Sequence, residues 1–288
     1  MLDQLITSIN WQDYHTNQKR YKAGTFIIEQ DSPPSSLFIL VKGMLYTYRN
    51  KTLISTVDKE GEYFGEVSIL LNIPHSATVE TVIESEIIEI PLKDVTPFLT
   101  KSPIVAISLA RSLADRLVNQ NTQLARKIVE PLKNLEDQKN IKTRSGVKDS
   151  LDLDRLKNHY KEFRPHVELI LQGRKPTALY ILVSGKVEII KNSKVIAVED
   201  VPGYYFGDVS VLRDSPANAT VKTIDKTICI EIPISKVSDF LTHSPDVAIN
   251  ISKKLAERIL TINDEFLNLQ EELSRKNMLK FVKKNSNF

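Results

Sequence analysis

The chain contains an internal duplication. When the sequence is aligned with itself at an offset of 142 residues, Tyr21 onward matches Phe163 onward without a gap. The densest match joins GEYFGEVSILLNIPHSATV, residues 61–79, to GYYFGDVSVLRDSPANATV, residues 203–221, with 11 of 19 positions identical. A chain of 288 residues is long enough for two domains that each bury a core. The duplication therefore predicts two domains that share one fold.

The boundaries follow from where the repeated pattern stops. Residues 131–150 lie between the copies, mix positive and negative charges, and include Ser145-Gly146. We therefore expect a first domain at residues 1–130, a linker at 131–150 and a second domain at 151–288.

Within each unit the spacing of apolar residues changes once, from the alternation of strands to the spacing of a helix. In the first copy, short runs alternate apolar with polar or β-branched residues, as in TFIIE, SLFILV, MLYTYR, LISTV, ATVETV and SEIIEI. Seven or eight such strands predict a sandwich or barrel rather than a parallel sheet. The apolar spacing then becomes three and four residues, which is typical of a helix. Ser102-Pro103 and Ser244-Pro245 stand at these transitions, as an N-cap and a first helical proline would.

Composition argues against several classes of function. The chain is 41% hydrophobic and 26% charged, its net charge is +3, and it lacks an uncharged apolar stretch of about 18 residues. The amino terminus has no basic start followed by an apolar run, so a cytoplasmic protein is expected. Cys229 has no partner for a disulfide and lies in an alternating run, which indicates a buried strand residue.

No catalytic or metal-binding pattern is evident. The histidines are scattered, with neither a His-x-His nor a His-x-x-x-His pair, and no P-loop or nucleophile-base set is present. We therefore expect neither a metal ion nor enzymatic activity. The five histidines are His15, His75, His159, His166 and His243.

The order of strands, glycine-punctuated turns, Phe-Gly-Glu loop, Pro-x-x-Ala-Thr-Val strand and closing helix resembles the cyclic nucleotide-binding domain family. It is similar to the sensor half of catabolite activator proteins and to the tandem modules of protein kinase A regulatory subunits. The resemblance covers roughly residues 18–130 and 160–275. It implies a mainly β fold with flanking helices: two tandem β-jelly rolls, each closed by a long C-terminal helix.

The resemblance also implies a ligand site. In that family a short helix after Phe-Gly-Glu presents backbone N–H groups to the cyclic phosphate, and the glutamate accepts a hydrogen bond from the ribose hydroxyl. This chain has Glu66 in one copy and Asp208 in the other. The candidate ligand-binding residues are Phe64, Gly65, Glu66, Val67, Ser68, His75, Ser76 and Thr78 in the first copy, and Phe206, Gly207, Asp208, Val209, Ser210, Arg213, Asn218 and Thr220 in the second.

Both copies depart from the family at one position. The family places an arginine two residues before the Ala-Thr pair, where it grips the phosphate through two hydrogen bonds, and here His75 and Ala217 stand there. A histidine is mostly neutral at pH 7 and an alanine has no donor. Because hydrogen bonds to charged groups contribute roughly 1.5–3 kcal/mol each, losing the pair weakens phosphate binding by about two to four powers of ten.

Three other side chains of the site have two interpretations each. Arg213 is either a substitute phosphate donor or a solvent-facing loop charge. Ser68 and Ser210 either donate to an anion or cap the short helix.

The last helix carries a seam typical of a coiled coil, with apolar residues spaced four, three, four, three and four apart. Either the two long helices pack together within one chain, or the last helix pairs with its copy in a homodimer. The seam favours the homodimer slightly, because Gln120 and Lys127 interrupt the corresponding face of the first helix. A third alternative is packing against the chain's own roll. The seam residues are Leu255, Ile259, Ile262, Phe266, Leu269 and Leu273.

Three functional hypotheses follow. The first is a non-catalytic sensor or adaptor that binds an unusual anionic nucleotide, such as a cyclic dinucleotide. Binding is signalled through the C-terminal helices to a protein partner. The second is a scaffold that binds partners without a ligand. The third is a receptor for cyclic AMP or cyclic GMP with substitute phosphate donors. Only about 15 residues follow Leu273, so sequence-specific DNA binding through an added helix-turn-helix domain is not expected.

Overall fold

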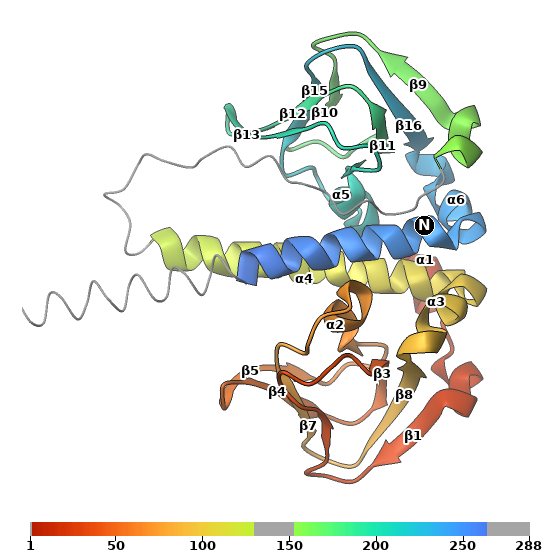
Figure 1. The fold of residues 1–288 in the computed structure, drawn as a ribbon, viewed down its shortest axis with the longest axis vertical. Coiled ribbons are helices and arrows are strands. Elements are labelled where there is room, and N and C mark those ends of the chain that lie inside the picture. The colour runs from red at the N-terminus through yellow and green to blue at the C-terminus, as the bar shows by residue number, and fades with distance from the viewer. Residues whose placement is uncertain (1, 130–152, 264–288) are drawn as a thin grey trace, which may run out of the picture.

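The computed structural model describes residues 2–129 and 153–263, and in them each repeat forms a β-roll of two four-stranded antiparallel sheets (Figure 1). In the first roll the sheet orders are β1-β8-β3-β6 and β2-β7-β4-β5, and the second roll repeats them as β9-β16-β11-β14 and β10-β15-β12-β13. The predicted fold class is confirmed.

The first roll begins with a helical segment that the sequence analysis did not predict. Its elements are α1 (Leu2–Thr7), η1 (Trp11–Asn17), β1 (Gln18–Tyr21), β2 (Phe26–Ile28), β3 (Ser36–Lys42), β4 (Leu45–Arg49), β5 (Thr52–Val57), β6 (Tyr63–Phe64), α2 (Glu66–Leu71), β7 (Thr78–Thr81), β8 (Ser85–Pro91), α3 (Leu92–Lys101) and α4 (Pro103–Val129).

The second roll follows the same order. Its elements are η2 (Asp154–His159), β9 (Tyr160–Phe163), β10 (Glu168–Ile170), β11 (Ala178–Ser184), β12 (Val187–Lys191), β13 (Lys194–Glu199), β14 (Tyr205–Phe206), α5 (Asp208–Arg213), β15 (Thr220–Thr223), β16 (Thr227–Pro233), η3 (Ile234–Lys236), α6 (Val237–His243) and a closing helix over residues 245–263.

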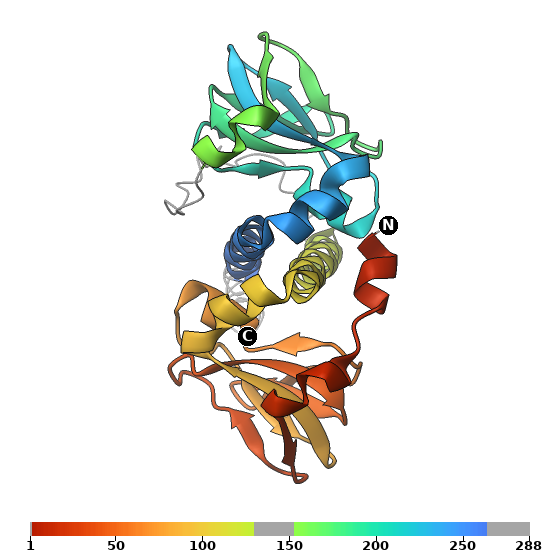
Figure 2. The same cartoon turned by 90° about the vertical axis from the view of Figure 1, so that its right-hand side faces the viewer.

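The two closing helices lie side by side in the middle of the molecule, with one roll on each side (Figures 1 and 2). Helix α4 begins at Pro103, as the Ser-Pro pattern predicted, and the second closing helix begins directly after Ser244. Helices α2 and α5 face this central pair from opposite sides (Figure 1). The pair therefore lies next to the candidate site of each roll.

The described part of the apolar seam of the last helix is buried within the chain. Leu255, Ile259 and Ile262 belong to one hydrophobic core that also contains Leu113 and Leu117 of α4. Burying side chains of this size contributes roughly 1.5–3 kcal/mol each. For these residues the structure supports the intramolecular alternative, and the homodimer that the seam slightly favoured is not shown. The rest of the seam, Phe266, Leu269 and Leu273, lies outside the described residues.

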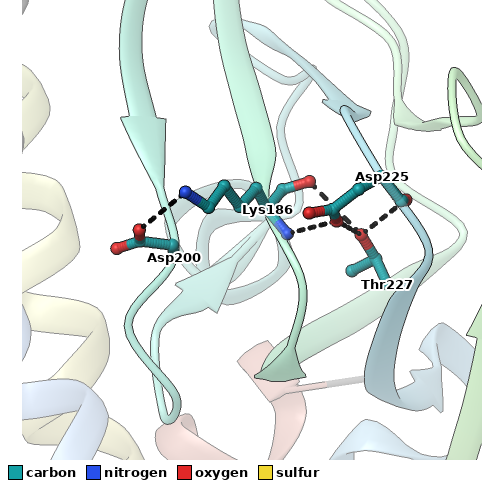
Figure 3. Close-up of polar contacts among 4 residues, drawn as sticks. All are labelled: Lys186, Asp200, Asp225 and Thr227. Atoms are coloured by element: carbon teal, nitrogen blue, oxygen red, sulfur yellow. Dashed lines mark hydrogen bonds and ion pairs between the residues drawn. The ribbon is translucent and has the colours of Figure 1, made fainter.

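The rolls share a fold but differ in their polar contacts. In the second roll Lys186 follows the turn after β11, and its ammonium lies 3.5 Å from Asp200 while its backbone N–H donates to Asp225 at 2.8 Å (Figure 3). The Thr227 hydroxyl donates to the Lys186 carbonyl at 3.2 Å. At the equivalent place in the first roll, Met44 N–H donates to the hydroxyl of Ser85.

Cys229 is fully buried on β16, as its sequence context predicted. Burial, and to a lesser degree the Glu231 carboxylate, raises the pKa of the thiol to about 12. Cys229 is therefore a core residue whose thiol stays protonated.

Candidate functional site

We define the cassettes as residues 63–78 in the first roll and 205–220 in the second. In each, a two-residue strand leads through one glycine into a six-residue helix. Gly65 has φ 74° and Gly207 has φ 79°, in the left-handed region that favours glycine. A Cβ atom at Gly65 would lie 3.0 Å from Ile28 Cδ1. The backbone of the turn therefore requires the glycine of the Phe-Gly-acid sequence.

The acidic residue after each glycine is buried and paired with an arginine of its own closing helix. Glu66 is 1% exposed and forms an ion pair with Arg116, whereas Asp208 is 4% exposed and lies 2.9 Å from Arg258 Nη1. The second guanidinium nitrogen donates to the carbonyl of Tyr63 at 3.3 Å in the first roll, and to that of Tyr205 at 3.4 Å in the second. These charge-assisted hydrogen bonds fasten each cassette to its helix.

The sequence analysis missed both arginines. Each follows its carboxylate by 50 residues, and the two occupy equivalent positions in the two repeats. An arginine retained at the same distance from a retained carboxylate in both copies is the signal that could have found them.

The positions of the missing arginine hold no cation. His75 is 3% exposed and Ala217 is 6% exposed. The Nε2 atom of His75 is buried and has no hydrogen-bond partner among residues 2–129 and 153–263. Burial lowers the pKa of His75, so its imidazole is neutral at pH 7.

This burial predicts that acid destabilises the first roll. Because the pKa of His75 is lower in the folded than in the unfolded state, its contribution to stability is complete above the unfolded value of about 6.5 and is lost as the pH falls below it. Urea unfolding at pH 7.5 and pH 5 should show a smaller loss of stability in His75→Leu than in the unchanged protein. The exposed His15, changed to Leu, is the control, and equal losses in all three proteins would contradict this role of His75.

Arg213 is not the solvent-facing charge that one interpretation offered, and its role as a substitute phosphate donor stays a prediction. It is one-quarter exposed, and its Nε donates to Asp115 Oδ1 of α4 at 2.7 Å. It therefore joins the second cassette to the closing helix of the first roll. Asp115 and Arg116 are consecutive, so one turn of α4 contacts both cassettes.

The remaining candidate residues have mostly structural contacts. The predicted serine caps are wrong, because glycines occupy the N-cap positions and the hydroxyls of Ser68 and Ser210 donate to the carbonyls of Pro74 and Pro216, each at 3.4 Å. Phe64 and Phe206 are buried, Val67, Val209, Thr78 and Thr220 are half-buried, and Ser76 and Asn218 are exposed.

The two threonines accept a backbone hydrogen bond each. Thr78 Oγ1 accepts from Gln30 N–H and Thr220 Oγ1 from Gln172 N–H, both at 3.0 Å. These bonds fix the start of strands β7 and β15. The predicted contact of the two threonines with a ligand stays a proposal.

A further guanidinium lies at the first cassette. Arg49, the last residue of β4, donates from Nε to the carbonyl of Ser76 at 3.1 Å. No carboxylate in the described parts of the chain forms an ion pair with it. Its counterpart in the second roll, Lys191, is exposed.

Two classes of site find no support in the described parts of the chain. Across residues 2–129 and 153–263, no group of three or more His, Cys, Asp or Glu side chains is placed to hold a metal ion. None of the helices in the same ranges combines the length and the apolar character needed to cross a membrane.

The family model for the cyclic nucleotide-binding domain matches residues 18–102 and 160–244. The chain therefore belongs to the cyclic nucleotide-binding domain family, and it contains two such domains in tandem.

Relatives at the sequence level are regulatory proteins and kinases. A cGMP-dependent protein kinase of Eimeria tenella is 29% identical over 213 residues, which are 74% of this chain and 19% of that protein. A cAMP-dependent protein kinase regulatory subunit of Debaryomyces hansenii is 26% identical over 231 residues, which are 80% of this chain and 46% of the subunit. The match thus spans less than half the length of each of these relatives.

Two examples follow of solved structures that resemble the chain. The regulatory domain of Toxoplasma gondii PKA, crystallised with cAMP, is 18% identical with a TM-score of 0.30, and the match covers 89% of this chain and 94% of that one. The catabolite activator protein of Thermus thermophilus is 23% identical with a TM-score of 0.38, and the match covers 44% of this chain and 63% of that one.

Proposed function

We propose that this chain is the nucleotide-sensing part of a signalling regulator and has no catalytic activity of its own. The observation that carries the proposal is the equivalent carboxylate-arginine pair in each roll, Glu66 with Arg116 and Asp208 with Arg258. The carboxylates occupy the position at which the family binds the ligand's ribose hydroxyl, and the arginines lie on the helices that close the rolls. Each pair therefore links a ligand position to a closing helix.

The link gives ligand binding a route to the helices. A nucleotide whose hydroxyls donate to the carboxylate competes with the guanidinium for the same oxygens. Binding then favours conformations in which the closing helix is held differently, which is a shift of population between existing states. Because Asp115 of α4 holds Arg213, a change at α4 also reaches the second cassette.

The ligand and the partner are assigned by chemistry. Neither His75 nor Ala217 supplies the cation that grips a single cyclic phosphate, so cyclic AMP and cyclic GMP bind weakly. A larger anionic nucleotide such as a cyclic dinucleotide, which places charge over a wider surface, is the proposed ligand. The relatives named as kinases and kinase regulatory subunits support a protein kinase as the proposed partner.

A second candidate is a scaffold that acts without a ligand. It is favoured by the same pairs, because an arginine of the chain itself already occupies each carboxylate. In this case the rolls serve to hold the two closing helices in one fixed arrangement.

Calorimetric titration separates the two functions. The probes are cyclic AMP, cyclic GMP, cyclic di-AMP and adenosine, added to the unchanged protein and to Glu66→Ala and Asp208→Ala. A sensor binds cyclic di-AMP more tightly than cyclic AMP, and at least one of the variants loses about tenfold or more in affinity. If no probe gives heat at millimolar concentration, the sensor is wrong and the scaffold is supported.

A further inference from the structure

We propose that the two rolls have different roles. The first roll binds and releases an anionic, hydroxyl-bearing ligand. In the second roll, ion pairs from the cassette to the two closing helices hold these elements together, and we call this arrangement the clamp. The ligand half of this inference rests on the proposed sensing function. The clamp half rests on contacts within the chain alone.

The arginine of the second roll is enclosed by several groups. Its guanidinium contacts Asp208 at 2.9 Å and lies 5.3 Å from the centre of the Tyr204 ring, within cation-π range. A second carboxylate, Glu199 at the end of β13, is fully buried and also acts on this guanidinium. Burial alone lowers the pKa of Arg258, but Asp208, Tyr204 and Glu199 together raise it above its usual value. The side chain is 17% exposed, so it is held as a largely covered, permanently charged group.

The first roll lacks this enclosure. Val57 stands at the position of Glu199 and Glu62 at that of Tyr204. The Glu62 carboxylate accepts from the backbone N–H groups of Asp58 and Lys59, at 3.2 and 3.3 Å, rather than contacting the arginine. Arg116 pairs with Glu66 among the carboxylates of the described chain, and its side chain is 36% exposed. Water and solutes therefore reach the Arg116 guanidinium more readily than that of Arg258, although both carboxylates are buried.

The second cassette is also held from outside its own roll. Arg213 binds Asp115 of α4, whereas its counterpart in the first cassette is Leu71, which carries no charge. The backbone hydrogen bonds within the cassettes are also shorter in the second roll than in the first. Val211 N–H donates to the Gly207 carbonyl at 2.8 Å, while the equivalent bond from Ile69 to Gly65 is 3.2 Å.

The balance of charge favours an anion in the first roll alone. Two guanidinium groups contact the first cassette, Arg49 at the Ser76 carbonyl and Arg116 at the Glu66 carboxylate. In the second, Arg258 pairs with Asp208 and the charge of the buried Glu199 also raises its pKa, while Arg213 is already paired with Asp115. The counterpart of Arg49 there is an exposed lysine. The buried Glu199 carboxylate, whose charge acts on Arg258, also opposes a phosphate, because charges interact more strongly where water is excluded. The structure thus assigns Arg49 as the cationic contact for the ligand's anionic group.

Hydrogen exchange of the ligand-free chain tests the clamp. Two pairs of equivalent amides report on the cassettes: Ile69 with Val211, and Ile73 with Ser215, all of which donate to carbonyls of their own cassette. After correction for intrinsic rates, the second-roll amides should exchange about tenfold or more slowly than their first-roll partners. Equal rates, or faster exchange in the second roll, would overturn the clamp.

A residue swap tests its cause. Glu199→Val with Tyr204→Glu gives the second roll the residues of the first, and Val57 is buried at its own position, so the pattern is compatible with the fold. Exchange at Val211 and Ser215 should then accelerate about tenfold, while that at Ile69 and Ile73 stays unchanged. Unchanged exchange in α5 would show that the enclosure of Arg258 does not hold the cassette.

Titration with cyclic di-AMP tests the ligand half. Arg49→Gln should weaken binding about tenfold or more, and the matched Lys191→Gln should leave it unchanged. Equal effects, or a loss confined to Lys191→Gln, would overturn the assignment while leaving the sensing function in place. If cyclic di-AMP binds neither roll of the unchanged protein, the ligand half fails with the sensing function, and the exchange rates still decide the clamp.

Discussion

His75→Arg is expected to raise the affinity of the first roll for cyclic AMP by about two to four powers of ten. The substitution returns a two-pronged, permanently charged donor to the position where the family grips the phosphate. The site tolerates a polar side chain, since His75 already places an unpaired nitrogen inside the cassette, with no partner in the described residues. Calorimetric titration of the variant and the unchanged protein measures the gain.

Two controls make this result specific. Adenosine shares the base and ribose of cyclic AMP but has no phosphate, so its affinity should not change. The equivalent Ala217→Arg should gain less, because the second roll has the additional buried carboxylate Glu199, whose charge acts on Arg258. A gain for adenosine equal to that for cyclic AMP, or no gain for either, would show that the pocket differs from the family at more than this position.

Local sequence patterns predicted most of the fold. The six runs quoted for the first copy correspond to β2, β3, β4, β5, β7 and β8. Burial follows the alternation in β7, whereas β3 is buried at six of its seven positions and β5 is exposed at five of its six. The two missed strands have physical reasons. Strand β6 has only two residues, and β1 reads QKRY, whose strand structure depends on pairing with β8 across the whole roll.

The arrangement of the helices could not be predicted from the seam. An apolar stripe at heptad spacing records that a face is covered, and leaves open whether the covering helix belongs to the same chain. Polar side chains that interrupt α4 favoured a partner copy, yet Leu113 and Leu117 suffice to continue the core across both helices. The intramolecular choice depends on where the two rolls place their helices, which is a property of the whole fold.

The glycine-to-helix turn of each cassette was predicted, the ion pairs of its acidic residue were not, and the ligand role of the site stays a prediction. The glycine and the acid of each cassette are adjacent in sequence, so a motif finds them. The arginine partners of Glu66 and Asp208 lie 50 residues further along the chain, on another element. Arg213 pairs with Asp115, which lies 98 residues away in the other repeat. Ion pairs of this separation leave a trace in a single sequence only when a duplication repeats them.

Asp208→Ala is expected to lower the free energy of unfolding by about 3–5 kcal/mol. The change leaves Arg258 mostly buried and without its carboxylate partner, and breaking one side of a buried ion pair costs more than removing the pair. Urea denaturation at pH 7, followed by circular dichroism, measures the loss. The equivalent Glu66→Ala should lose less, because Arg116 is more exposed and water takes over part of its solvation.

A double-mutant cycle isolates the pair from the rest of the core. Arg258→Leu removes the charge and keeps an apolar stem for packing, so the double variant Asp208→Ala/Arg258→Leu should be more stable than Asp208→Ala alone. The recovery should be incomplete, because Glu199 then loses the positive charge that acts on it. If the double variant is as unstable as the two single losses added together, the two side chains are energetically independent, and the pair cannot be what fastens the second cassette to its helix.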